Sequence, residues 1–162
     1  MLREALIGAA AGAVGTVALN VTTYADMALR GRAASSVPYE AAGRLAEKVG
    51  IDLSAEGEEQ DGPTAQNRKS GLGALQGYVV GLGLGVAYGL VRPRLGDVPV
   101  PLAGLGLALA AMAGSDAPTA ALGVVDPTTW PASTWAMDLG FHLPYGLVTA
   151  VAYEAFSGTK SA

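Results

Sequence analysis

The stretch GALQGYVVGLGLGVAYG, residues 73–89, carries a glycine at every fourth position. In a water-soluble helix each of these glycines would cost about 1 kcal/mol relative to alanine. The stretch holds no charged residue, and the uncharged run covers residues 71–91. In a bilayer, helix association depends on close backbone approach, which small residues at every fourth position allow. The pattern therefore predicts a membrane helix with a tightly packed stripe, formed by Gly73, Gly77, Gly81, Gly85 and Gly89.

The composition of the whole chain also indicates a membrane protein. Of the 162 residues, 51% are hydrophobic and only 15% are charged, whereas a soluble domain usually carries about 25% charged residues. The apolar residues form four blocks of roughly the 20 residues that a bilayer core requires. We therefore expect an all-α integral membrane protein, a four-helix bundle in one domain over residues 1–162, with helices at about 4–29, 70–91, 99–114 and 133–156. The first block is too long for the apolar region of a cleaved signal peptide and is read as a retained helix.

The glycine stripe has two interpretations that the sequence leaves open. It could form a homo-oligomeric interface, or it could pack helices tightly inside one bundle. The first predicted helix repeats the pattern with Gly8, Gly12 and Gly15.

A polar connection, residues 30–69, separates the first two predicted helices. Within it, residues 38–49 predict a short amphipathic helix, because Pro38 suits a first helical position and apolar residues recur at helical spacing. This helix would lie in the membrane interface or pack over the bundle. Residues 54–67 are rich in Asp and Glu and predict a mobile, solvated segment. The connection is also where we expect a protein partner to dock.

Several classes of function are disfavoured by the composition. The chain has no cysteine and a net charge of −4, so it has no thiolate chemistry and no basic footprint for nucleic acid. It has no phosphate-binding glycine loop with a lysine, and GLGLG lies inside an apolar span instead of between a strand and a helix. We expect no cofactor and no metal.

The polar residues of the predicted spans gather at one end. In an up-down bundle, the first and third helices end at the membrane face where the second and fourth begin. Arg68, Lys69 and Gln76 of the second helix fall at that end, and the candidate cavity-lining residues there are Asn20, Thr23, Asp116, Asp138, His142 and Tyr145. The opposite end offers little beyond Tyr88 and Glu154.

Spacing along the fourth helix groups three of these residues on one face. Asp138 and His142, four residues apart, can hydrogen-bond along a helix, and Tyr145 extends the line inward. Because an ionisable group facing lipid costs several kcal/mol, we expect the Asp138–His142 pair to face the bundle, close to Asn20 or Thr23.

Each candidate also has a structural interpretation. Asp138 suits the dipole at a helix start, and His142 could be a core histidine bonded to Asp138. Asn20 and Thr23 could be interhelical hydrogen-bonding groups. Asp116, two residues before Pro118, could form a turn.

The segment DLGFHLPYG, residues 138–146, together with GSDAP at 114–118 and DP-x-x-W at 126–130, resembles small bacterial multi-pass membrane proteins of the YagU-like type. The resemblance implies an integral membrane location and a helical bundle. It implies no established chemistry.

The sequence supports three functional hypotheses. The first is a polar, titratable cavity at one membrane face that binds or conducts a small solute, proton or cation, with His142 titrating near neutral pH. The alternative is a non-catalytic interaction subunit or assembly factor. A metal-dependent enzyme using Asp116, Asp138 and His142 has a thin ligand set, so we expect no enzymatic activity.

The distribution of basic residues indicates which loops face the cytoplasm. The short, doubly basic turn RPRLG, residues 92–96, favours a cytoplasmic location for that turn and for both termini. The basic residues of the connection favour the opposite orientation; they are Arg30, Arg32, Arg44, Lys48, Arg68 and Lys69.

Overall fold

The structure is a computed structural model that describes residues 1–59 and 61–158. These residues contain helices and no strand, which confirms the all-α prediction. Two short 3-10 helices, η1 (Arg92–Arg94) and η2 (Pro127–Thr129), join longer elements. The α-helices are α1 (Leu2–Arg30), α2 (Val37–Lys48), α3 (Pro63–Val91), α4 (Val100–Ala121) and α5 (Ala132–Ser157).

Three helices in the described part of the chain are long and apolar enough to cross a membrane: α1, α3 together with η1, and α4. Their length and composition indicate a membrane protein. Helix α5 has 26 residues but is not among the three, because residues such as Asp138, His142 and Pro144 lower its hydropathy.

Two helices extend beyond their predicted bounds. Helix α3 begins at Pro63 instead of residue 70, and proline suits a first helical position because the N–H that it lacks would have no helical partner. Helix α4 continues through Pro118 to Ala121 instead of ending at residue 114. Around that proline, Thr119 Oγ1 donates to the Ser115 carbonyl at 3.0 Å, so side-chain bonds support the helix where proline removes a backbone bond.

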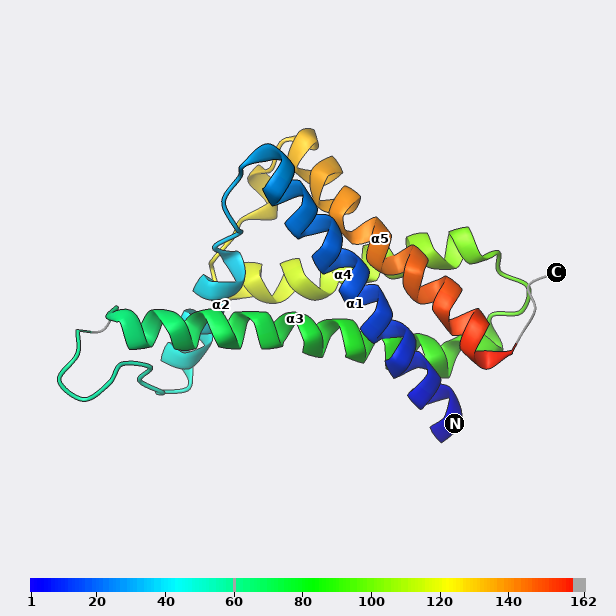
Figure 1. Cartoon of the computed structure of the whole chain (residues 1–162), viewed down its shortest axis with the longest axis horizontal. Helices are drawn as coiled ribbons and strands as arrows, with labels where there is room; N and C mark the ends of the chain where they lie inside the picture. Colours follow the sequence, from blue (N-terminus) through cyan, green and yellow to red (C-terminus); the bar gives the residue numbers. More distant parts are fainter. Residues whose placement is uncertain (60, 159–162) are drawn as a thin grey trace.

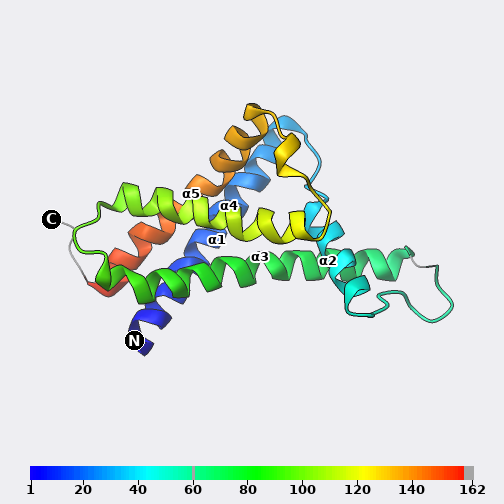
Figure 2. The same cartoon turned by 180° about the vertical axis from the view of Figure 1, so that it is seen from behind.

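The helices form two crossed pairs. Helices α1 and α5 lie side by side and cross α3 and α4 obliquely (Figures 1 and 2). Helix α1 packs on both α3 and α5, helix α5 also packs on α4, and α3 and α4 touch each other only sparsely. Helix α2 covers the start of α3, which projects away from the two chain ends (Figure 1).

The glycine stripe turns around α3 instead of running straight along it. A helix has 3.6 residues per turn, so each four-residue step rotates the stripe by about 40°. Gly73 consequently meets Pro38 of α2, whereas Gly81, Gly85 and Gly89 meet α1, and a Cβ on Gly77 would find nothing within 4 Å.

The contact between α1 and α3 is a contact of backbones. A Cβ added to Gly12 would stand 2.6 Å from the carbonyl oxygen of Gly81. Helices α4 and α5 approach in the same way, since a Cβ on Gly146 would stand 2.6 Å from the Ala108 nitrogen. Four of the five stripe glycines thus face other helices of the same chain, and the homo-oligomer stays a proposal.

Candidate functional site

Helix α5 places His142 directly over Asp138. The Nδ1 atom of His142 lies 2.9 Å from the backbone oxygen of Asp138 and 3.3 Å from its Oδ1. The two side chains are 14% and 22% exposed. A carbonyl oxygen can only accept, so Nδ1 carries a hydrogen and Nε2 has a free lone pair in the neutral ring.

Helix α4 brings a second carboxyl group to this pair. The carboxyl groups of Asp116 and Asp138 interact electrostatically across the two helices, and Ser115 Oγ lies 3.5 Å from Asp116 Oδ1. The Oδ2 atom of Asp138 is buried without a hydrogen-bond partner among the described residues. Two ionised carboxylates have no hydrogen to share and repel each other, so the arrangement favours a proton or another cation between them. We call Asp116, Asp138 and His142 the acidic cluster.

The acidic cluster adjoins a cavity of about 330 Å³ between the second half of α4, η2 and the start of α5. Asp116 is the one ionisable residue in its lining, which is otherwise formed by Leu109, Met112, Ala113, Ala117, Ala120, Pro127 and Trp135. The ring of Trp135 also packs against Trp130, with 5.1 Å between ring centroids. The combination is an open, mainly apolar hollow with one acidic residue in its lining.

Tyr145 lies one helical turn beyond His142, at the centre of the fold. Its side chain is 1% exposed, and its hydroxyl donates to the Gly81 carbonyl at 2.7 Å. It therefore ties α5 to α3, and its hydroxyl is engaged away from the acidic cluster.

Asn20 and Thr23 are half-buried on α1 and make no side-chain hydrogen bond within the described residues. The sequence predicts that they lie close to the Asp138–His142 pair. Among the described residues, no hydrogen bond joins either side chain to that pair. The end of α1 instead contributes Arg32, which pairs with Asp26 and whose guanidinium carbon lies 5.0 Å from the centre of the Phe141 ring.

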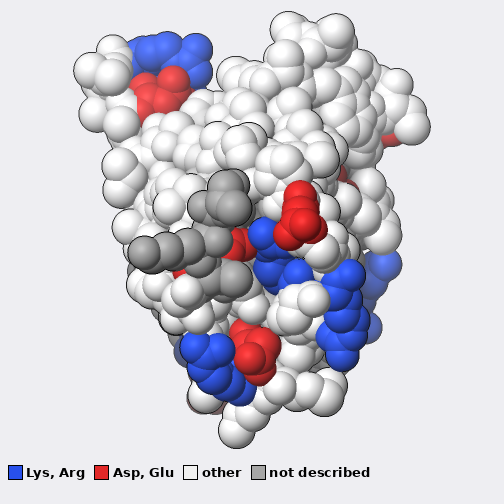
Figure 3. Space-filling view, turned by 90° about the vertical axis from the view of Figure 1, so that its right-hand side faces the viewer, with Lys and Arg blue, Asp and Glu red and all other residues white. Residues whose placement is uncertain are grey.

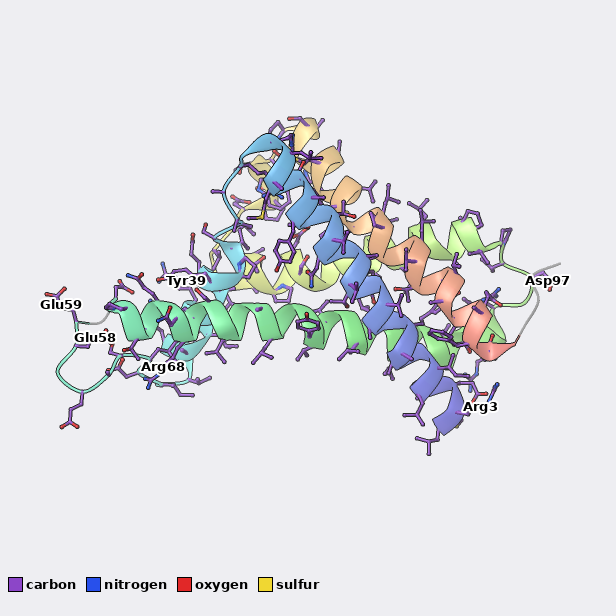
Figure 4. The ribbon with its side chains drawn as sticks, in the orientation of Figure 1. Arg3, Tyr39, Glu58, Glu59, Arg68 and Asp97 are labelled. Carbon is purple, nitrogen blue, oxygen red and sulfur yellow. The ribbon has the colours of Figure 1, made fainter. Side chains whose placement is uncertain are left out.

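Arg68 and Lys69 do not join the polar end that the sequence predicts for them. Arg68 donates to the carbonyls of Leu53 and Ser54, each at 3.0 Å, and Lys69 pairs with Asp61. These bonds lie at the projecting start of α3, where Arg68 is seen beside the connection (Figure 4).

The acidic part of the connection is held by backbone hydrogen bonds. The Glu58 carboxylate accepts from the N–H of Thr64 at 3.0 Å and from that of Ala55 at 3.1 Å. These bonds hold the pKa of Glu58 below its ordinary value. Residues 54–67 thus include a capped helix start, and their predicted mobility remains a prediction.

The sequence prediction missed a buried ion pair at the opposite end. Arg92 Nε lies 2.6 Å from Glu154 Oε1, and the two side chains are only 13% and 11% exposed. The rings of Tyr88 and Tyr153 pack beside them, 5.2 Å apart. The sequence places Tyr88 and Glu154 at this end but does not predict that Arg92 pairs with Glu154. Basic and acidic side chains gather here on an otherwise mainly uncharged surface (Figure 3).

A signal for this pair was present in the sequence. Glu154 lies near the end of α5 and Arg92 directly follows α3. In an up-down arrangement these ends share a face, and a buried carboxylate requires a cation nearby.

Within residues 1–59 and 61–158, no group of three or more His, Asp or Glu side chains is arranged to hold a metal ion. Comparison with protein-family models, with curated proteins and with solved structures finds no match for this chain.

Proposed function

We propose that the chain is a multi-pass protein of the cell membrane in which α5 crosses the bilayer together with α1, α3 and α4. At 1.5 Å per residue, its 26 residues span about 39 Å. It packs against α1 and α4, two of the three apolar helices. Its polar groups meet other helices, since Tyr145 reaches α3 and Asp138 meets Asp116 of α4. Such shielding removes the main cost of polar groups in a membrane helix.

We propose that this four-helix membrane bundle binds a proton or a small cation at the acidic cluster. The observation that carries this proposal is the buried Oδ2 of Asp138, which has no donor in the described structure, on a residue that interacts electrostatically with the Asp116 carboxyl group of α4. The other oxygen of this carboxylate, Oδ1, lies 3.3 Å from His142 Nδ1. A buried carboxylate oxygen without a donor is costly, and a shared proton or a bound cation at Oδ2 would compensate that cost. His142 contributes an imidazole, the side chain that ordinarily exchanges protons near neutral pH.

Conduction beyond the cluster requires movement of Tyr145. This side chain fills the centre of the bundle and is bonded to Gly81. We therefore propose that the resting state binds the cation at one face and that conduction depends on release of the Tyr145 hydroxyl.

Proton flux in liposomes tests this proposal. The purified chain is reconstituted with a pH-sensitive dye inside, and dissipation of a pH gradient is followed with a potassium ionophore clamping the voltage. We expect flux above that of empty liposomes, and its loss in Asp138→Asn and His142→Ala. Asp97→Asn, which removes an exposed acid at the other end of the molecule (Figure 4), serves as the matched control. Equal flux in all three variants would contradict the assignment.

The orientation follows from the basic turn after α3. We propose that this turn and both termini face the cytoplasm, because a short loop with Arg92 and Arg94 favours that side. The basic residues of the first connection act against this bias. The chain has no cysteine, so Ser35→Cys and Asp97→Cys give clean single labels. We expect an impermeant thiol reagent on intact cells to label only Ser35→Cys; exclusive labelling of Asp97→Cys would reverse the orientation.

A second function, docking of a protein partner, is favoured by the exposed side of α2 and the residues after it. Leu45, Val49 and Ile51 are 52%, 60% and 57% exposed. We propose this surface as the docking site if the chain is an interaction subunit. A second copy of the chain would instead dock at an unused part of α3, such as the exposed Gly77, where an added Cβ would meet nothing within 4 Å. Crosslinking of the wild type and of two variants distinguishes these two modes of docking. Gly77→Leu should reduce crosslinks between two copies of the chain, and Leu45→Glu should reduce crosslinks to a protein partner.

A further inference from the structure

We infer that the cavity beside Asp116 binds a free organic ammonium ion carrying an apolar group. This inference rests on the proposed cation site and names the class of ligand. It is carried by the chemistry of the cavity wall, which combines one carboxyl group, one indole and six aliphatic or thioether side chains.

The apolar wall excludes a strongly hydrated ion as the preferred occupant. A small inorganic cation needs several oxygen ligands to replace its water, and Asp116 is the one carboxyl residue in this lining. An alkylammonium or arylammonium ion requires no such oxygen shell. Its apolar group gains from contact with Leu109 and Met112, and burial of that surface is favourable by about 25 cal/mol per Å².

The charge distribution selects a cation over a neutral ligand. No Lys or Arg contributes to the cavity lining, and the carboxyl group of Asp138 adds negative potential at Asp116. A ligand ammonium group at Asp116 would take the place of the shared proton between the carboxyl groups. Trp135 lines the same cavity, and an indole ring can attract a cation through its face as a second source of selectivity.

The size of the cavity sets the size of the ligand. Its volume of about 330 Å³ falls at the lower end of the range for small-molecule sites. Benzyltrimethylammonium combines one ring with one fixed positive charge and is a suitable probe. Its neutral analogue is neopentylbenzene, in which carbon replaces the charged nitrogen.

The chain contains its own reporter for binding. It has two tryptophans, Trp135 in the cavity wall and Trp130 packed against it. Titration of the full chain in nanodiscs of phosphatidylglycerol, which has no amine headgroup, is therefore followed by tryptophan fluorescence. We expect saturable quenching by benzyltrimethylammonium and binding of neopentylbenzene that is weaker by about tenfold or more.

Variants separate the contribution of charge from that of shape. Asp116→Asn should remove the preference for the charged probe, and Ala117→Phe should fill the cavity and weaken both probes without a change in charge. Asp97→Asn should bind as wild type does. Equal affinity for the two probes in wild type, or an unchanged preference in Asp116→Asn, would overturn the inference. If Asp116→Asn does not fold, Ala117→Phe decides, because unchanged binding in that variant also overturns it.

Two further measurements complete the test. The first asks whether a lipid headgroup supplies the ammonium group, and the second separates failure of the ligand assignment from failure of the proposed function. Phosphatidylethanolamine added to the nanodiscs should leave the affinity for the probe unchanged; competition that Asp116→Asn abolishes would assign the cavity to a lipid headgroup and overturn the inference. Proton flux that depends on Asp138 but is accompanied by no ammonium binding would overturn only the ligand class. Loss of the Asp138 dependence of flux would overturn the proposed function itself.

Discussion

Alanine at Gly85 should separate α1 from α3, whereas alanine at Gly77 should be tolerated. A Cβ on Gly85 would meet the Gly8 carbonyl oxygen and would stand 2.7 Å from the Gly12 Cα and 2.9 Å from the Gly12 nitrogen. All three atoms belong to the backbone of α1, so no side-chain rotation relieves the overlap. A Cβ on Gly77 finds nothing within 4 Å.

The size of the effect follows from these distances. Carbon atoms attract best at about 3.5–4.0 Å, so a 2.7 Å approach requires the helices to part by about 1 Å. Each neighbouring contact that is stretched by this amount loses up to about half of its attraction. Overpacking of this kind costs about 1–3 kcal/mol. Alanine returns up to about 1 kcal/mol of helix propensity at either position. We therefore expect Gly85→Ala to be less stable than Gly77→Ala by about 1–3 kcal/mol.

Thermal unfolding of the two variants in one detergent measures this difference directly. With about 2–4 °C per kcal/mol for a chain of this size, the midpoint for Gly85→Ala should lie roughly 2–12 °C below that of Gly77→Ala. Because both variants make the same chemical change on the same helix, differences in detergent binding or propensity cancel. Equal midpoints would refute the backbone contact between α1 and α3.

Three other predictions concern individual side chains. Glu154→Leu should lower the free energy of unfolding by about 3 kcal/mol or more, because it leaves the buried Arg92 unpaired; replacing both residues by leucine should recover most of the loss, and an additive double variant in chemical unfolding would contradict a coupled pair. Tyr145→Phe removes one hydrogen bond to Gly81, worth about 1 kcal/mol, and should raise proton flux in liposomes; unchanged flux would show that Tyr145 does not gate. The pKa of Glu58 is lowered by the N–H groups of Thr64 and Ala55, so its stabilising contribution is complete above the ordinary carboxyl pKa near 4.5 and is lost as the pH falls below it toward the lowered pKa. Amide exchange at Thr64, corrected for its intrinsic pH dependence, should lose protection over that acid range in wild type but not in Glu58→Gln, and an identical pH dependence would contradict the cap.

The sequence predicted the helices well because apolar length and glycine spacing are local properties. The spacing of four residues also predicted the contact of His142 with Asp138, and up-down connectivity assigned Asp116 to the same end of the bundle. What it could not predict is the rotation of each helix about its own axis, which packing fixes. The predicted proximity of Asn20 or Thr23 to the Asp138–His142 pair depends on this rotation and stays a prediction.

Rotation also explains why the glycine stripe serves two partners. Because a four-residue repeat rotates slowly around the helix, Gly73 faces α2 and Gly85 faces α1. The spacing of the glycines does not predict that the change of partner helix falls at Gly77. The extension of α3 back to Pro63 was missed for a different reason. Its first turns are polar, and they are stabilised by α2 and by the Glu58 cap instead of by lipid.

Infrared spectroscopy of the carboxyl groups in the reconstituted chain tests the central claim, that Asp116 and Asp138 together hold a proton, most directly. A protonated carboxyl group has a C=O stretch that an ionised one lacks. At neutral pH we expect such a band in wild type, shifted by exchange into heavy water, and its loss in both Asp116→Asn and Asp138→Asn, because either change removes one member of the pair. The band should persist in Asp97→Asn. Absence of the band in wild type at neutral pH, or its survival in both variants of the pair, would contradict the claim.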